Sequence, residues 1–370
     1  MALKRPDLAV EILEEKDLWG QVQDHLKIAG PVISAFVLRK VVMITSVVAV
    51  GHLGAHYLAA AGLASVTANV TGNSMVIGLS GALVTLCSQA NGANNKTEMN
   101  HAMQRALIIL WLFICLPASV LWLCSEPIMV CLGQNEAIAR STKDYMVVLI
   151  PGLWALSASQ CITTWLYAQA KTQAVASITL AVALLHPLWL YLFIHYFQIG
   201  FLGSAVALSL TKCIELIILL LYINIFSSII KDTEFAWSSA CWQHWVPFLK
   251  LGLPNLLMMS EWWASEIIIF MSGALPDPEI QMGAMSIYQN MLALCFMLPG
   301  GVREACSTII GNAIGTFIIT PLADNVHTVK SLPKHFASIT PLSLSVLVYQ
   351  VQAKRMWPDQ AVLLRQLWPW

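Results

Sequence analysis

The residues best suited to chemistry in this chain are two glutamates inside an otherwise apolar stretch. Glu261 and Glu266 stand in the segment Met259-Ser260-Glu261-Trp262-Trp263-Ala264-Ser265-Glu266. A low-dielectric environment disfavours the charged form of a carboxyl group, so such a group can take up and release a proton. Five residues apart on a helix, the two side chains point about 140° away from each other. Glu261 is the first candidate for proton exchange and Glu266 the second. The alternative is a structural carboxyl that fixes helix packing.

Several polar and aromatic residues lie inside other apolar stretches and could line a cavity. Taken singly, such residues are common packing contacts between membrane helices, so each one alone is expected to be structural. As a set they suit a wide cavity for a ligand with polar and aromatic parts. The candidates are Asn69, Asn73, Gln160, Tyr167, His186, Trp262, Tyr288, Gln289 and Asn290.

Four further charged residues interrupt apolar segments. Arg39 and Lys40 stand midway along the first segment, where pairing with a carboxylate or extension toward the inner surface is the favoured interpretation. Lys212 and Glu215 are three residues apart on one helix face and are expected to neutralise each other. A role in substrate contact or ion coupling is the alternative for each of these residues.

The chain shows no pattern typical of a metal site, a nucleotide site or a catalytic centre. His52 and His56 are four residues apart, but no carboxylate stands near them, so no metal site is expected. No Walker loop, GxSxG or HExxH pattern occurs, which disfavours an ATP-driven pump and an enzyme. The nine cysteines occur singly and are expected to be buried thiols. The sequence therefore predicts no cofactor.

The composition indicates which elements must position these residues. Of 370 residues, 58% are hydrophobic and only 11% are charged, and the mean hydropathy is +0.69. Soluble domains carry about 25% charged residues, so this chain is expected to lie in a lipid bilayer. The formal net charge is zero, which gives no basic excess to attract nucleic acid.

Apolar segments long enough to cross a membrane recur along the chain. A spanning helix needs about 20 mostly apolar residues. Eight segments qualify, and they run over 30–50, 58–86, 106–123, 145–166, 175–197, 204–226, 253–271 and 282–299. The predicted fold is therefore an all-α polytopic membrane protein with about eight transmembrane helices.

The basic residues predict the orientation of these helices. Nine lie in segments on the side of the N-terminus and only Arg140 and Lys143 on the other side. The nine are Lys4, Arg5, Lys16, Lys27, Lys96, Arg105, Lys171, Lys231 and Lys250. Because cytosolic loops carry the excess of lysine and arginine, the N-terminus is expected in the cytosol.

An internal repeat with an offset of roughly 222 residues gives the domain plan. Gly78 then falls on Gly300 and, with one slipped residue, Gln89-Ala90-Asn91-Gly92 falls on Asn312-Ala313-Ile314-Gly315. Parallel repeats are typical of secondary transporters with a pathway between two lobes. The predicted parts are a cytosolic segment 1–27, a six-helix lobe 28–226, a cytosolic linker 227–250, a partial second lobe 251–315 and a divergent, poorly ordered tail 316–370.

Several motifs together resemble one family, the MATE (multidrug and toxin extrusion) transporters, in its eukaryotic branch. They are Val50-Gly51-His52-Leu53-Gly54, the run 82–90 ending in Gln89-Ala90, the pattern from Gly152 to Tyr167, Leu251-Gly252-Leu253-Pro254, and Glu261-Trp262-Trp263 with Glu266. The resemblance covers about residues 25–315. Arg39-Lys40 departs from it, since that stretch is uncharged in the family.

The resemblance implies a MATE-like fold in two lobes, with the second lobe incomplete here. It implies an antiporter that exports small organic cations, drugs or secondary metabolites in exchange for protons or Na⁺. It also implies that Glu261 takes part in coupling and substrate binding, with Glu266 as a weaker correspondence. The alternative is a non-transporting membrane product that associates with a full-length transporter. The plasma membrane and the vacuolar membrane both remain open as locations.

Overall fold

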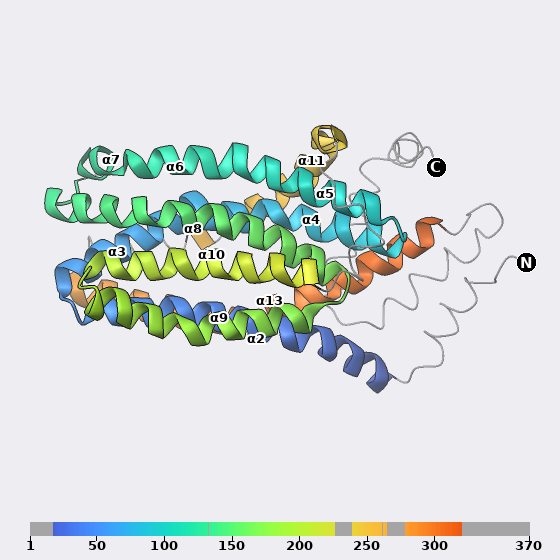
Figure 1. Cartoon of the computed structure of the whole chain (residues 1–370), viewed down its shortest axis with the longest axis horizontal. Coiled ribbons are helices and arrows are strands. Elements are labelled where there is room, and N and C mark those ends of the chain that lie inside the picture. Colours follow the sequence, from blue (N-terminus) through green and yellow to red (C-terminus); the bar gives the residue numbers. More distant parts are fainter. Residues whose placement is uncertain (1–17, 132, 226–238, 261, 265–277, 320–370) are drawn as a thin grey trace, which may run out of the picture. The chain divides into compact units, whose positions relative to one another are not determined.

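A computed structural model of the chain describes residues 18–131, 133–225, 239–260, 262–264 and 278–319. All elements in these ranges are helical (Figure 1). They are α2 (Leu18–Gly51), α3 (Ala55–Ala68), η1 (Asn69–Asn73), α4 (Ser74–Gly92), α5 (Lys96–Leu110), η2 (Trp111–Cys115), α6 (Leu116–Leu123), α7 (Ser125–Cys131), α8 (Glu136–Ala168), α9 (Thr172–Tyr191), η3 (Leu192–Tyr196), α10 (Phe201–Ile225), η4 (Ser239–Trp242), α11 (Trp245–Met258) and α13 (Pro278–Ile319).

Within the described residues, seven stretches of helix are long and apolar enough to cross a membrane. They are His25–Gly51, His56–Gly92, Lys96–Leu123, Glu136–Ala168, Thr172–Tyr196, Phe201–Ile225 and Met291–Thr316. These agree with the first six and the eighth of the predicted segments, and the all-α polytopic fold is confirmed. The predicted segment 253–271 is described only in part, by α11 and by residues up to 264.

Two helices run further than the sequence predicts. The first begins at Leu18 and includes part of the predicted segment 1–27. The last was predicted to end at residue 299, but α13 continues through Pro299 to Ile319. A proline inside a helix removes one backbone hydrogen bond without forcing the helix to end, and membrane helices tolerate this.

Three of the spanning stretches contain a wider π-helical turn: η1, η2 and η3. In η1 the indole Nε1 of Trp122 donates to Thr71 Oγ1 at 2.8 Å, while Thr71 itself donates to the carbonyl of Thr67 at 2.6 Å. Thr71 in the π-helical turn therefore has a hydrogen-bond partner, Trp122, on another helix, α6. π-Turns are frequent at functional sites, and this one carries Asn69 and Asn73 at its ends.

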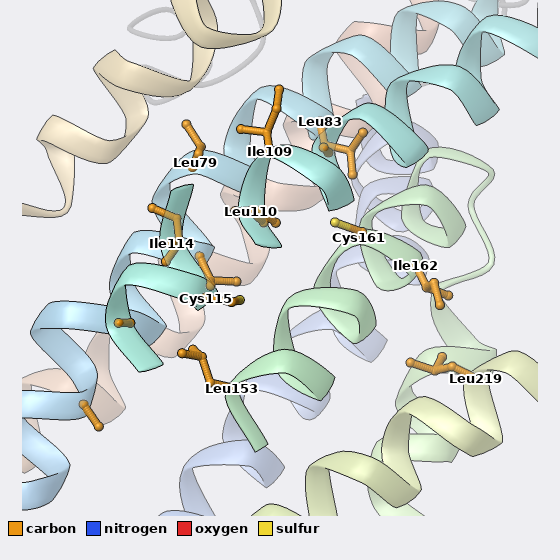
Figure 2. Packing of buried hydrophobic residues seen from close by; sticks show 14 of the residues in the cluster. Leu79, Leu83, Ile109, Leu110, Ile114, Cys115, Leu153, Cys161, Ile162 and Leu219 are labelled. Carbon is orange, nitrogen blue, oxygen red and sulfur yellow. The ribbon is translucent and has the colours of Figure 1, made fainter. Parts of the chain in front are cut away.

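The helices α2 to α10 form a bundle around one apolar core. In Figure 1, α8 and α10 run side by side, as do α2 and α9, and these two pairs make extensive contacts. Leu83, Leu110, Cys161 and Leu153 are all buried in the core that Figure 2 shows. The predicted six-helix lobe 28–226 covers these helices, and its boundaries stay a prediction.

The helices of the two sequence repeats contact each other in equivalent ways. A Cβ added to Gly78 of α4 would lie 2.9 Å from the Cα of Leu256 in α11. In α13 the corresponding close approach is at Gly301, the residue after the repeat counterpart Gly300, where an added Cβ would lie 3.1 Å from the Cα of Ile33 in α2. The contact of α4 with α11 is therefore the counterpart of the contact of α2 with α13.

The chain divides into two units, residues 1–316 and 317–370. Of the second unit, the structure describes only residues 317–319. The predicted tail 316–370 thus lies almost wholly outside the described residues.

Candidate functional site

A buried ion-pair cluster joins α2 to α10 inside the bundle. Arg39 donates to Glu215 Oε1 from Nε at 3.2 Å and from Nη2 at 2.8 Å. Lys212 donates from Nζ to the other carboxylate oxygen, Oε2, at 3.2 Å. Glu215 is only 3% exposed, so its charge depends on these two partners. The three side chains together carry one positive charge in excess.

The structure confirms the predicted pairing of Lys212 with Glu215 and identifies the carboxylate that Arg39 reaches. Arg39 and Glu215 are 176 residues apart in the chain. A charge at bilayer depth is expensive unless it is paired, so the cluster explains how this chain accommodates an arginine in its first spanning helix.

His186 of α9 lies close to this cluster and is completely covered. Its Nε2 is 2.8 Å from Ser46 Oγ, and its Nδ1 is 2.8 Å from Thr211 Oγ1. Thr211 also donates its single hydroxyl proton to the carbonyl of Ala207 at 2.6 Å, so a proton on Nδ1 of His186 satisfies this contact. Ser46 lies 3.2 Å from the carbonyl of Val42 as well, and donation to the nearer Nε2 gives a neutral ring with a partner at each nitrogen. In this arrangement His186 ties α2, α9 and α10 together.

Tyr167 lies near the end of α8. It is 3% exposed, and its hydroxyl has no hydrogen-bond partner among the described residues. The unpartnered hydroxyl of Tyr167 can hydrogen-bond to a ligand that binds transiently.

The other predicted cavity residues lie on different elements. Asn69, Asn73 and Gln160 are half-buried within the bundle. Trp262 packs edge-to-face on Phe296 of α13, with ring centroids 5.0 Å apart and planes at 77°. Tyr288 of α13 is 58% exposed.

Four predicted residues are only partly covered by the structure or not covered at all. Glu261 and Glu266, the main coupling candidates, lie outside the described residues. Gln289 and Asn290 belong to α13, but only their backbone is described. Their roles remain predictions from the sequence.

One charged pair on α13, Arg303 and Glu304, was not predicted from the sequence. Two adjacent charges inside the apolar stretch Met291–Thr316 were a visible signal. They were missed because the predicted helix ended at residue 299, which placed them outside the membrane. In the described ranges, no group of three or more His, Cys, Asp or Glu residues is positioned to hold a metal ion.

Comparisons with known proteins agree with this architecture. A family model described as MatE matches residues 31–192. Protein DETOXIFICATION 16 of Arabidopsis thaliana is 33% identical over 311 residues, which make up 84% of this chain and 64% of that protein. Multidrug and toxin extrusion protein 1 of Danio rerio is 33% identical over 296 residues, 80% of this chain and 50% of that protein. The crystal structure of the eukaryotic MATE transporter AtDTX14 superposes with a TM-score of 0.75 at 27% identity, covering 80% of this chain and 66% of that one.

The chain belongs to the MATE family.

Membership in the MATE family confirms the fold, the polytopic membrane location and the class, which is that of transporters and not enzymes. This MATE chain spans 64% of the length of DETOXIFICATION 16 and 50% of the fish protein. A second solved structure, described as the outward-facing conformation of a multidrug resistance MATE transporter, shares the fold with a TM-score of 0.64 at 17% identity.

The ion-pair cluster makes a ranked prediction for stability. Glu215→Gln should lower the free energy of unfolding by about 3–5 kcal/mol, because it leaves both Arg39 and Lys212 without their shared carboxylate. Arg39→Met should cost less, since Lys212 still pairs with Glu215. Thermal unfolding of the purified protein in detergent measures both effects.

A matched control for Glu215→Gln is Glu126→Gln. Glu126 pairs with Lys143 at 3.0 Å, but both side chains are about one-third exposed (30% and 34%). An exposed pair contributes about 0–1 kcal/mol. Equal losses for the two Glu→Gln variants, or a larger loss for Arg39→Met than for Glu215→Gln, would contradict the account of the cluster.

Proposed function

We propose that this protein is a secondary antiporter that exports small organic cations, drugs or secondary metabolites in exchange for protons or Na⁺ by alternating access. The observation that carries the proposal is the similarity to eukaryotic MATE transporters along four-fifths of the chain, both in sequence and in structure. The names of these relatives refer to detoxification and to multidrug and toxin extrusion. The two repeats, which meet through equivalent contacts, support alternating access.

The proposed coupling carboxylate is Glu261, and its sequence neighbours support the choice. Trp262 follows it and lies against Phe296, which gives this part of the chain an aromatic, low-dielectric character. Aromatic faces attract organic cations, and a carboxylate beside them binds a cation only while it is ionised. Protonation of Glu261 would therefore release the cation, so proton entry and substrate release compete for one site. Glu266 is the second candidate.

Glu215, the buried carboxylate of the first lobe, is less suited to proton coupling and substrate binding. Glu215 is already held by Arg39 and Lys212, so a proton or a cationic substrate would have to displace two positive charges. The proposed coupling site therefore lies in the second repeat.

We further propose that the N-terminus is cytosolic, on the basis of the excess of lysine and arginine on that side. The loop between α4 and α5 then faces the cytosol. Asn94 in this loop has a left-handed backbone, with φ 52°, so it lies in a turn that can receive an insertion.

The orientation predicts the accessibility of this loop. A protease site inserted at Asn94 should be protected in intact cells and cleaved after the membrane is opened. A second site at Gly133, in the loop on the opposite side with φ 84°, should be cleaved from outside. The reverse pattern would overturn the proposed orientation.

The coupling proposal predicts the effect of one neutralising substitution. Glu261→Gln keeps the side-chain volume and mimics the protonated carboxyl, so it should abolish export driven by a pH gradient. Glu266→Gln should reduce export less. Efflux of a cationic dye from vesicles under an imposed pH gradient is the measurement, with insertion and expression checked for each variant.

The control for this assay is Glu136→Gln, which changes an exposed carboxylate at the start of α8. It should leave export unchanged. Undiminished efflux by the Glu261→Gln protein would remove Glu261 from the mechanism. A parent protein that inserts but exports no dye would instead favour the alternative of a non-transporting membrane product.

A further inference from the structure

The tightest contact between the two repeats lies where α4 ends and α5 is about to begin. Gly92 of α4 and Gly315 of α13 leave no room for a side chain. A Cβ on Gly92 would overlap the carbonyl oxygen of Asn312, and a Cβ on Gly315 would overlap the carbonyl oxygen of Gln89. Backbone therefore lies directly against backbone, which only glycine permits.

This contact is symmetric with respect to the sequence repeat. In the repeat alignment Gly92 corresponds to Gly315 and Gln89 corresponds to Asn312. Gly92 faces Asn312, which is the counterpart of Gln89. Gly315 faces Gln89, which is the counterpart of Asn312. The two helices thus meet around a pseudo-twofold axis, as two copies of one motif do in a symmetric dimer.

Asparagine side chains close the same contact with hydrogen bonds. Asn91 donates from Nδ2 to Asn312 Oδ1 at 2.8 Å. Both asparagines also donate to the carbonyl of Ala168, at 3.0 Å in each case. Ala168 is the last residue of α8, where backbone carbonyls lack partners inside the helix. The contact therefore joins three helices through one acceptor.

Two flanking groups complete the contact. Lys96 donates from Nζ to Asn91 Oδ1 at 3.2 Å, and Thr316 donates from Oγ1 to the carbonyl of Gly92 at 3.1 Å. Asn91, Gly92, Asn312 and Gly315 together are called the inner-end clasp below.

We propose that the inner-end clasp is the gate that closes the transport pathway at its cytosolic end. The proposal rests on the antiport function and the orientation proposed above. Glycine backbones in direct contact leave no path for water or substrate between α4 and α13 while the clasp is closed. When the clasp opens, Asn91 and Asn312 exchange the hydrogen bond between them for hydrogen bonds to water. A neutral hydrogen-bonded contact is worth about 1 kcal/mol per bond, so it can alternate between two states more readily than a buried ion pair.

Position 88 offers a direct readout of the gate. Ser88 is completely buried and faces Gly311, one turn before the clasp; a Cβ on Gly311 would lie 2.5 Å from Ser88 Cβ. The hydroxyl of Ser88 has no hydrogen-bond partner among the described residues, so Ser88→Cys removes no bond that the structure shows. A cysteine there reacts with a water-soluble maleimide only when the clasp is open.

The test compares the labelling rate of Ser88→Cys in the full chain with and without a disrupted clasp. Gly92→Ala together with Gly315→Ala should raise the rate about tenfold, because each added methyl overlaps a backbone carbonyl; a factor of ten corresponds to about 1.4 kcal/mol. Gly62→Ala is the matched control, since an added Cβ there meets nothing within 4 Å, and it should leave the rate unchanged. Mass spectrometry of the purified protein in lipid nanodiscs assigns the label to position 88.

A second variant disrupts the clasp without crowding it. Asn91→Asp with Asn312→Asp replaces the 2.8 Å hydrogen bond by two like charges and should also raise labelling at position 88. The native Cys161, buried in the core of the bundle, reports unfolding in every sample. It should stay unlabelled.

Three outcomes would overturn the gate. The first is a parent in which position 88 already reacts as fast as the exposed Cys124. The second is an unchanged rate in both clasp variants, and the third is labelling of Cys161 in step with position 88, which would make the clasp a purely structural contact. None of these readouts requires transport. The labelling assay can therefore refute the gate while dye efflux supports the antiport function, and dye efflux can refute the antiport function while labelling supports a closing contact.

Discussion

The structure depends on how closely α4 can approach the helices of the second repeat. Lipid chains are as apolar as leucine, so membrane helices associate through close packing and hydrogen bonds. Along α4, Gly78 and Gly81 face α11, and Gly92 faces α13. At Gly78 and Gly92 an added Cβ would overlap backbone atoms of the neighbouring helix, whereas at Gly81 the nearest atoms belong to the Asn255 side chain. The contact of the two repeats, and with it any pathway between them, follows from this row of glycines.

The polar groups of the two repeats are used differently. In the first repeat Arg39 and Lys212 both pair with Glu215 inside the bundle, and His186 has a hydrogen-bond partner at each ring nitrogen. These groups connect α2, α9 and α10. Toward the second repeat, Tyr167 presents an unpartnered hydroxyl among the described residues, and the two asparagines of the clasp share a neutral hydrogen bond. The chemistry that changes during a cycle is therefore expected at the seam between the repeats and in the second repeat.

Hydropathy was sufficient to predict most of the helices, because its signal extends over many residues, and the family followed from a set of short motifs along the chain. The pairing of Lys212 with Glu215 was also predictable, since it needs only helical spacing. The partner of Arg39 was not, because it lies 176 residues away and depends on how α2 packs against α10. The continuation of α13 through Pro299 was missed for a related reason: a proline signals the end of a helix unless neighbouring helices support it. The site residues Glu261 and Glu266 rest on the sequence alone.

If α4 carries the contact between the repeats, an intramolecular disulfide should form between α4 and α11. A Cβ on Gly81 would lie 3.2 Å from the Cβ of Asn255 in α11, close to the range of about 3.5–4.5 Å found in disulfides. Gly81→Cys with Asn255→Cys should therefore cross-link rapidly on mild oxidation in native membranes, with peptides around residues 81 and 255 joined in the mass spectrum. Gly62→Cys with Asn255→Cys, which has no such neighbour at position 62, should not. Failure of the first pair to cross-link, or equal cross-linking of both pairs, would contradict the account.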